Sequence, residues 1–213
     1  MDNSKKIILD LCGGTASWSK PYKAAGYDVR LITLPDNDVR TYTPPENVYG
    51  ILAAPPCTMF SLTRTKAKKP RDLKEGMEIV RSCLDIIWTC MEIKQDTRYK
   101  KLPLKFWALE NPNGMLKYFL GKPALEFDPW EYGDEYQKKT HLWGWFNEPK
   151  KVIIKKPKGD LALYKSLAPE KRIKFDMLKT KDIAPEFYGK LTRTERRAIT
   201  PAGFAKTFFL ANQ

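Results

Sequence analysis

Apolar runs and helical stretches alternate through the first half of the chain. Short β-forming runs predict strands at residues 6–11, 27–34, 49–54 and 105–110. Between the last two, apolar side chains recur at steps of three and four, which predicts one long helix with a single buried face. That face comprises Leu73, Met77, Val80, Leu84, Trp88 and Met91. Because strands that alternate with helices are typical of a mostly parallel sheet with helices on both faces, we expect an α/β fold.

The pattern changes after Gly121. Short aromatic-rich segments, LEFDPWEYG and THLWGWF, are punctuated by prolines and glycines and predict antiparallel strands or an irregular cap at one sheet edge. Residues 150–200 are lysine-rich and weakly periodic, so they predict no definite element. The last segment, TPAGFAKTFFLANQ, starts with Thr-Pro and predicts a closing helix. Since 213 residues can bury one substantial core, we expect a single domain, residues 1–213.

Composition excludes several classes of protein. No apolar run approaches the roughly 18 residues that a membrane span needs, so we expect no membrane partner. The four cysteines form no CxxC pair and lie far in sequence from the single histidine, His141, which argues against a metal site or a disulfide framework. Cysteine usage favours a reducing compartment, the cytoplasm. Cys83 and Cys90, seven apart on the predicted helix, are expected as buried small apolar residues.

The net charge of +13 is concentrated toward the carboxyl end. Residues 149–213 hold 16 Lys and Arg against 6 Asp and Glu, a net charge of +10, and the rest of the chain contributes +3. This distribution indicates a polyanionic partner. Surface lysines that only keep the protein in solution would give the same count, and charge alone does not separate the two interpretations.

The segment DLCGGTASW, residues 10–18, directly follows the first predicted strand. Its glycines let the backbone approach a ligand closely, and Asp10 at the strand's carboxyl end can hydrogen-bond a polar part of that ligand. Open α/β sheets bind nucleotides at this place. The GxGxxG spacing is missing, and a tight turn without any ligand would also explain the pattern.

The segment APPCTMFS, residues 54–61, places a cysteine immediately after two prolines and a strand. Prolines stiffen the backbone, so Cys57 is a candidate for a positioned nucleophile. A thiol with a pKa of about 8.5 needs cationic neighbours to become a thiolate. The following RTKAKKPRDLK carries six basic residues that could lower this pKa and grip phosphates. A buried loop thiol and a solvated basic loop remain the alternatives.

Two further segments carry polar side chains at predicted strands. ALENPNG, residues 108–114, brings Glu110 to the end of the fourth predicted strand. Beside a bound base, a protonated Glu110 could hydrogen-bond the N3 atom of cytosine. YQKKTHLWG, residues 136–144, presents Gln137, Lys139 and His141 on one face of a possible strand. The alternative for Glu110 is a glutamate that caps the next turn. The alternative for YQKKTHLWG is an ordinary exposed edge strand.

Together, in this order, the four segments resemble the DNA cytosine-C5 methyltransferases, most closely the compact, phage-type members. DLCGGTASW aligns without a gap on the family's DLFxGxGGF motif, with Trp18 where an aromatic ring packs on the adenine. Pro56, Cys57 and Thr58 align on its PCQ motif, and residues 110–112 on its ENV motif. The resemblance covers residues 6–145 and resumes at the closing helix.

The resemblance implies a Rossmann-like sheet that binds S-adenosylmethionine and methylates cytosine C5 in single- or double-stranded DNA. Cys57 would attack C6, Glu110 would support N3, and Lys139 would orient the thiolate or a phosphate. The cofactor would contact Asp10, Cys12, Gly13, Gly14, Thr15, Trp18, Asp36, Asp38 and Pro56. The substrate would contact Ser61, Arg64, Lys66, Lys68, Lys69, Asn111, Gln137 and His141. We expect a monomer in the cytoplasm of a bacterial or phage-infected cell.

The chain departs from the family in three places. Two arginines of the family's QxRxR motif are replaced, by Lys139 and His141. The acidic residue after the second strand, which holds the ribose, has only Asp36 as a stand-in, although Asp38 matches the next acidic position. Residues 150–200 are too short for the usual target-recognition domain and form a short basic segment in its place. Recognition of sequence is therefore expected to be brief or nearly absent.

Two alternative functions remain. A catalytically silent DNA-binding protein would keep the fold and the basic surface, but it has no use for both Cys57 and Glu110. A methyltransferase that acts on RNA or on free pyrimidine nucleotides would keep the chemistry; the basic carboxyl segment disfavours a mononucleotide and does not separate RNA from DNA.

Overall fold

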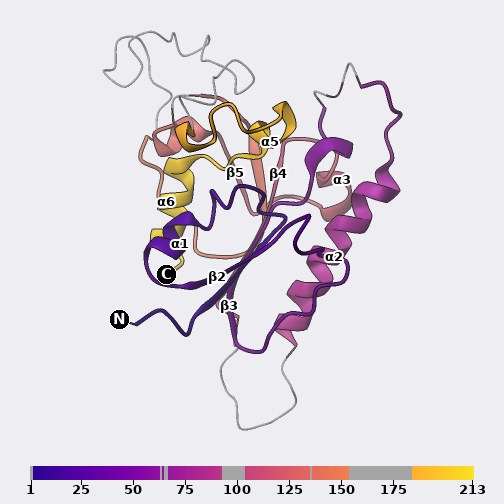
Figure 1. Ribbon diagram of the computed structural model, residues 1–213. Coiled ribbons are helices and arrows are strands. Elements are labelled where there is room, and N and C mark those ends of the chain that lie inside the picture. Colours follow the sequence, from indigo (N-terminus) through magenta and orange to yellow (C-terminus); the bar gives the residue numbers. More distant parts are fainter. Residues whose placement is uncertain (1, 63, 65–66, 93–103, 135, 154–183) are drawn as a thin grey trace.

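A six-stranded sheet forms the centre of the protein, in the strand order β2-β1-β3-β4-β6-β5 (Figure 1). The computed structural model describes residues 2–62, 64, 67–92, 104–134, 136–153 and 184–213. The strands are β1 (Ile7–Leu11), β2 (Asp28–Ile32), β3 (Val48–Ala53), β4 (Phe106–Pro112), β5 (Leu125–Phe127) and β6 (Thr140–Trp145). The helices are α1 (Lys20–Ala24), α2 (Leu73–Met91), α3 (Lys117–Leu120), α5 (Arg193–Ala198) and α6 (Ala202–Ala211). Short 3₁₀ turns are η1 (Cys57–Met59), η2 (Pro129–Tyr132) and η6 (Pro185–Phe187).

The sheet is parallel through its first four strands and antiparallel at one edge. β1 pairs in parallel with β2 and β3, and β3 pairs in parallel with β4. β6 runs antiparallel to both β4 and β5. The expected α/β class, all four predicted strands and the antiparallel edge are therefore confirmed. The strand predicted at 27–34 is shorter, Asp28–Ile32, because the chain turns away after Ile32.

Helix α2 covers one face of the sheet. Its bounds match the predicted helix, but the buried stripe is rotated from the predicted one. Trp88 is 52% exposed and Met91 36% exposed, so their prediction as core residues is wrong. The residues that α2 buries are Gly76, Val80, Cys83, Ile86, Ile87 and Cys90. Small side chains on this stripe let the helix approach the sheet closely, and the prediction that Cys83 and Cys90 are buried is confirmed.

Helices α1 and α6 cover the opposite face, although they are distant in sequence (Figure 1). Phe204 of α6 stacks on Phe127 of β5, with ring centroids 4.1 Å apart. Phe208 packs edge-on against Trp18, with centroids 5.3 Å apart. The predicted closing helix is thus confirmed, and its aromatic side chains join the two ends of the chain in one core.

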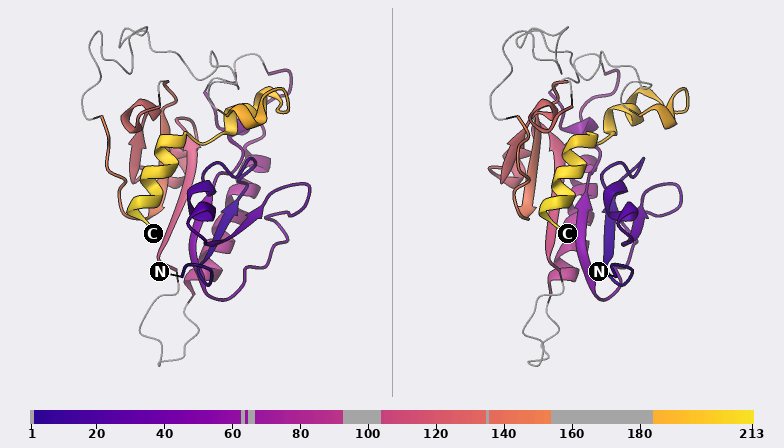
Figure 2. Two further views of the ribbon diagram at one scale, coloured as in Figure 1. Left: turned by 60° about the vertical axis from the view of Figure 1, so that its left-hand side comes forward. Right: turned by 90° about the vertical axis from the view of Figure 1, so that its left-hand side faces the viewer.

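Part of the predicted basic segment lies outside the described residues, at 154–183. Its last portion forms η6 and α5, and Figure 2 shows α5 at the opposite end of the sheet from both termini. None of the helices in the described part of the chain is both long enough and apolar enough to cross a membrane.

Candidate active site

Three loops meet where the strand order of the sheet reverses direction. From β1 the chain moves outward to β2 and then crosses back to β3 on the other side of β1. Open α/β sheets bind ligands in the crevice outside the carboxyl ends of the strands at such a switch point. The loops that follow β1, β3 and β4 at this edge contain the three segments that the sequence singled out, which makes it the candidate active site.

The loop after β1 has an unusual backbone. Cys12 and Ala16 have φ angles of 56° and 54°, in the left-handed region that non-glycine residues rarely adopt, and Gly14 has a φ of 52°. A Cβ atom at Gly13 would collide with the carboxylate of Asp10. Such local strain is typical of loops that approach a ligand, because the surrounding structure must hold it in place.

Asp10 lies beneath this loop with no exposure to solvent. Its Oδ2 atom accepts a hydrogen bond from the hydroxyl of Ser19 (2.5 Å), and its Oδ1 atom is buried without a partner among the described residues. Burial raises the pKa of Asp10 to about 6, although the hydrogen bond from Ser19 lowers this pKa in part. Asp10 therefore carries an unsatisfied acceptor at the centre of the loop.

The raised pKa of Asp10 predicts a gain in stability for Asp10→Asn at neutral pH. A carboxyl group whose pKa rises on folding contributes most to stability when it is protonated in both states, below its unfolded pKa of about 4. This contribution is lost as the pH rises through the folded pKa of about 6. Asparagine has no charge to bury, so the variant should exceed wild type by up to about 3 kcal/mol above pH 6 and match it near pH 4. Urea unfolding across this pH range measures the difference.

The exposed Asp36 supplies the control for this prediction. Asp36→Asn should leave the free energy of unfolding unchanged at every pH. A lower stability of Asp10→Asn than of wild type at pH 8 would contradict the burial argument.

The Cys57 loop is held by backbone contacts from three directions. Arg71 donates from its two terminal guanidinium nitrogens to the carbonyls of Met59 (2.6 Å) and Ser61 (3.1 Å). The amide of Met115, beyond β4, donates to the carbonyl of Phe60 (2.8 Å). On the third side α2 packs closely, since a Cβ atom at Gly76 would lie 2.9 Å from Cβ of Met59. The nucleophile candidate therefore sits on a fixed turn.

The end of β4 sends its two polar side chains to opposite faces of the sheet. Asn111 is fully buried and donates from Nδ2 to the carbonyl of Pro55 (2.9 Å), which ties β4 to the loop of Cys57. Glu110 points to the other face, where its Oε1 atom lies 3.9 Å from Nζ of Lys138. Burial raises the pKa of Glu110, and Lys138 lowers it by a smaller amount.

Charged groups from three parts of the chain act on the Cys57 thiol. Burial raises the pKa of Cys57 most, Lys138 lowers it, Glu110 raises it and Arg197 of α5 lowers it. The cations near the thiol are thus Lys138 and Arg197. Among the described residues of the predicted source, the basic run after Cys57, Arg71 is engaged by backbone carbonyls and Lys68 and Lys69 are exposed.

Lys139, predicted to act in catalysis, lies elsewhere. Its Nζ atom is 3.8 Å from Glu126 of β5, and the side chain is 49% exposed. His141, predicted to contact the substrate, is 2% exposed, with Nε2 3.7 Å from Glu126. Because successive side chains alternate between faces, Lys138 takes the position beside Glu110. The aligned family motif thus names the lysine that lies near Glu126, whereas Lys138 is the lysine near Glu110.

The difference between the two lysines is measurable as thiol reactivity. Lys138→Gln should slow alkylation of Cys57 by iodoacetamide several-fold near neutral pH, because loss of the cation raises the pKa of the thiol. Lys139→Gln should leave the rate unchanged, since its charge faces Glu126. Mass spectrometry of the Cys57 peptide separates this thiol from Cys12. Equal rates in the two variants would remove Lys138 from the site.

The remaining predicted cofactor contacts are only partly brought together. Trp18 is 2% exposed and packs between Phe204 and Phe208, so its ring offers no open face to an adenine. Asp38 is ion-paired with Arg40, which lowers its pKa, and Asp36 is exposed after β2. The β1 loop contains the predicted contacts Cys12, Gly13, Gly14 and Thr15. In this loop the hydroxyls of Thr15 and Ser17 are 2.6 Å apart. The last predicted contact, Pro56, directly precedes Cys57.

The predicted substrate contacts also divide. Ser61 lies in the Cys57 loop and forms an isolated bridge with Gly114. Gln137 is partly buried beside Lys138, and the Nε atom of Arg64 is buried without a partner among the described residues. Asn111 is committed to the carbonyl of Pro55. Lys66 lies outside the described residues.

Sequence reasoning missed Arg71, Lys138 and Arg197 as parts of the site. A lysine one position from a predicted catalytic residue is visible in the sequence, but only the strand pairing decides which of the two faces Glu110. In the sequence, Arg197 is only one of the basic residues in the carboxyl-terminal segment. Its electrostatic effect on Cys57 depends on where α5 lies in the fold.

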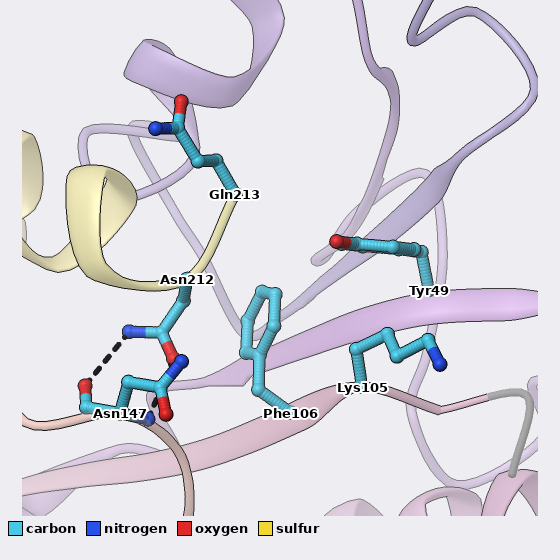
Figure 3. A pocket seen from close by; sticks show the side chains of 6 residues that line it. All are labelled: Tyr49, Lys105, Phe106, Asn147, Asn212 and Gln213. Carbon is cyan, nitrogen blue, oxygen red and sulfur yellow. Dashed lines mark hydrogen bonds between the residues drawn. The ribbon is translucent and has the colours of Figure 1, made fainter.

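A hollow lies at the opposite end of the sheet from the candidate active site. This pocket of about 200 Å³ is lined by Tyr49, Lys105, Phe106, Asn147, Asn212 and Gln213 (Figure 3). Asn212 donates to the carbonyl of Asn147 (3.0 Å), and the Asn147 amide donates back to Asn212 (2.8 Å). These bonds attach the carboxyl terminus to the sheet, so we interpret the polar lining as structural.

Comparison with known proteins adds no family assignment. No protein-family model matches the sequence, and no curated protein matches it. Among the described residues, no group of three or more His, Cys, Asp and Glu side chains could hold a metal ion.

Proposed function

We propose that this protein is an S-adenosylmethionine-dependent methyltransferase that acts on C5 of cytosine in DNA. One observation carries the proposal. Cys57 follows β3, and Glu110 lies near the carboxyl end of the neighbouring parallel strand β4, close enough to raise the pKa of the thiol; both are next to the strained loop of β1. The parallel strands with helices on both faces are consistent with a Rossmann-like methyltransferase domain.

The β1 loop supports the cofactor assignment better than the more distant residues do. Asp10 offers a buried oxygen without a partner, and the close approach of Gly13 leaves backbone without side chains at the crevice. These are features that a polar ligand can use. Trp18 does not fit the role of an adenine platform while α6 covers it, so we assign cofactor binding to Asp10, Gly13 and Gly14. When bound, S-adenosylmethionine supplies an electrophilic methyl group.

The residues of the site have complementary tasks in this reaction. The thiolate of Cys57 adds to C6 of an extruded cytosine, and the π-electron pair of the C5–C6 bond moves toward C5. Glu110, whose pKa is raised by burial, donates a hydrogen bond or its proton to N3 and stabilises the charge that develops on the ring. Lys138 and Arg197 stabilise the thiolate before attack and after release.

Completion of the reaction returns Cys57 to its starting state. Once C5 carries the methyl group, a base removes the C5 proton, the C5–C6 double bond re-forms and the thiolate leaves C6. The same cations that stabilise the thiolate before attack make it a better leaving group here. The described residues include no obvious base for C5, and a water molecule that reaches the crevice can serve.

Methyl transfer from labelled cofactor tests the proposal directly. The protein is incubated separately with cytosine-containing DNA, with RNA of the same sequence and with deoxycytidine triphosphate. We expect label in DNA, recovered as 5-methyl-2′-deoxycytidine after hydrolysis to nucleosides. Label found only in RNA, or only in the nucleotide, would replace DNA by that molecule as the proposed substrate. DNA binding without transfer to any of the three would favour a silent binding protein.

A further inference from the structure

Helix α3 presents two aromatic side chains to solvent beside the Cys57 loop. Tyr118 is 73% exposed and Phe119 47% exposed. Leu116 is buried and Leu120 partly buried, and because residues four apart share one helix face, this pair directs Tyr118 outward. The proposed reaction uses neither aromatic ring. Large apolar side chains that remain exposed near a site indicate a binding surface.

The position of α3 relative to Cys57 is fixed at both ends of the helix. Before it, Gly114 approaches Phe60 so closely that a Cβ atom would lie 2.5 Å from the Phe60 carbonyl. After it, the indole nitrogen of Trp143 donates to the carbonyl of Gly121 (3.0 Å). The ring of Phe119 also contacts that of Phe60, with centroids 6.4 Å apart. The exposed rings are therefore held at a set position against Phe60, which lies three residues after Cys57 in the sequence.

A positive charge adjoins the Tyr118 ring, and further lysines are exposed on the Cys57 loop that α3 contacts through Phe60. Nζ of Lys117 lies 5.6 Å from the ring centroid of Tyr118, and Lys68 and Lys69 are exposed on the loop that follows Cys57. Aromatic faces next to lysines match the two parts of a nucleic acid strand, because bases stack on the rings and phosphates pair with the cations. An apolar protein partner would match the rings but leave the lysines unpaired.

We infer that Tyr118 and Phe119 form a stacking platform for a nucleobase that flanks the target cytosine in single-stranded DNA, with Lys117 at the adjoining phosphate. The inference rests on the proposed function for the identity of the target base. In a duplex both faces of a base are covered by its neighbours, so only an unpaired strand can lay a base on the platform. Stacking tolerates any base, so it supplies affinity without a recognition domain.

Fluorescence anisotropy with a labelled single-stranded oligonucleotide that contains cytosine tests the platform. Tyr118→Ala should weaken binding about ten-fold, and Tyr118→Trp should restore it. Trp88→Ala is the matched control, because Trp88 is another large, exposed aromatic side chain and lies on α2. The affinity of this variant should equal that of wild type. Lys117→Gln should reduce the slope of log affinity against log salt by about 0.7. Thermal melting verifies that each variant is folded.

The outcomes separate the platform from the reaction. Unchanged affinity in Tyr118→Ala, with methyl transfer intact in wild type, overturns the platform and leaves the proposed function standing. Tighter binding of a matching duplex than of the single strand also overturns it. Tyr118-dependent binding without methyl transfer supports the platform and overturns the proposed reaction.

Discussion

DNA that carries 5-fluorocytosine is expected to trap the protein as a covalent adduct through Cys57 when S-adenosylmethionine is present. The reaction must remove the substituent at C5 to release the thiolate, and fluorine cannot leave as a cation, so the Cys57–C6 bond persists. A protein–DNA band that survives denaturing electrophoresis measures the adduct. Cys57→Ala should form no such band and should lose methyl transfer by at least about three orders of magnitude.

Cys12 provides the control for this experiment. It is the other partly exposed cysteine among the described residues and lies in the neighbouring β1 loop. Cys12→Ala should still be trapped. An adduct that persists in Cys57→Ala and disappears in Cys12→Ala would assign the nucleophile to the β1 loop and overturn the mechanism.

Glu110→Gln is expected to change two measurements in opposite directions. Methyl transfer should fall by roughly 10²- to 10⁴-fold, because glutamine has no proton to give to N3 of cytosine. Alkylation of Cys57 should become faster at neutral pH, because loss of the carboxylate removes a charge that raises the pKa of the thiol. A substitution that merely damaged the fold would not accelerate the thiol while slowing the reaction.

Glu126 is the matched carboxylate for this second prediction. It stands on β5, faces Lys139 and His141, and is 47% exposed. Glu126→Gln should alter neither methyl transfer nor alkylation of Cys57. Full turnover in Glu110→Gln would remove Glu110 from the mechanism.

The architecture of the sheet could be predicted from the sequence because its signals are local. The apolar runs placed four strands, and the pattern of α2 gave its bounds from Leu73 to Met91. The buried face of α2 was harder to predict, because several of the residues on it are small. Gly76 and Cys83 contribute little to an apolar pattern, yet both are buried, and Gly76 lets the helix pack closely on Met59 and Phe60 of the Cys57 loop.

The convergence of Cys57 and Glu110, the proposed nucleophile and its carboxylate, could also be predicted, since Cys57 follows β3 and Glu110 lies near the end of the neighbouring strand β4. Their partners could not. Lys138 and Lys139 lie just before β6, so the choice between them depends on how the chain enters that strand, and a shift of one residue reverses it. The burial of Trp18 depends on α6, which packs against it from almost two hundred residues away in the sequence. Such long-range packing leaves no trace in a local motif.

The chain enters and leaves the stretch 154–183 at two anchored points. The amides of Val152 and Ile153 donate to the carbonyl of Glu131 (2.9 and 3.0 Å), and Ala184 is 4% exposed. For a connection fixed at both ends, doubling its length costs only about 0.6 kcal/mol of closure entropy. Descendants of this gene can therefore lengthen, shorten or exchange that stretch while the strands keep Cys57 and Glu110 in place. The choice of substrate and the proposed chemistry would then evolve at separate rates.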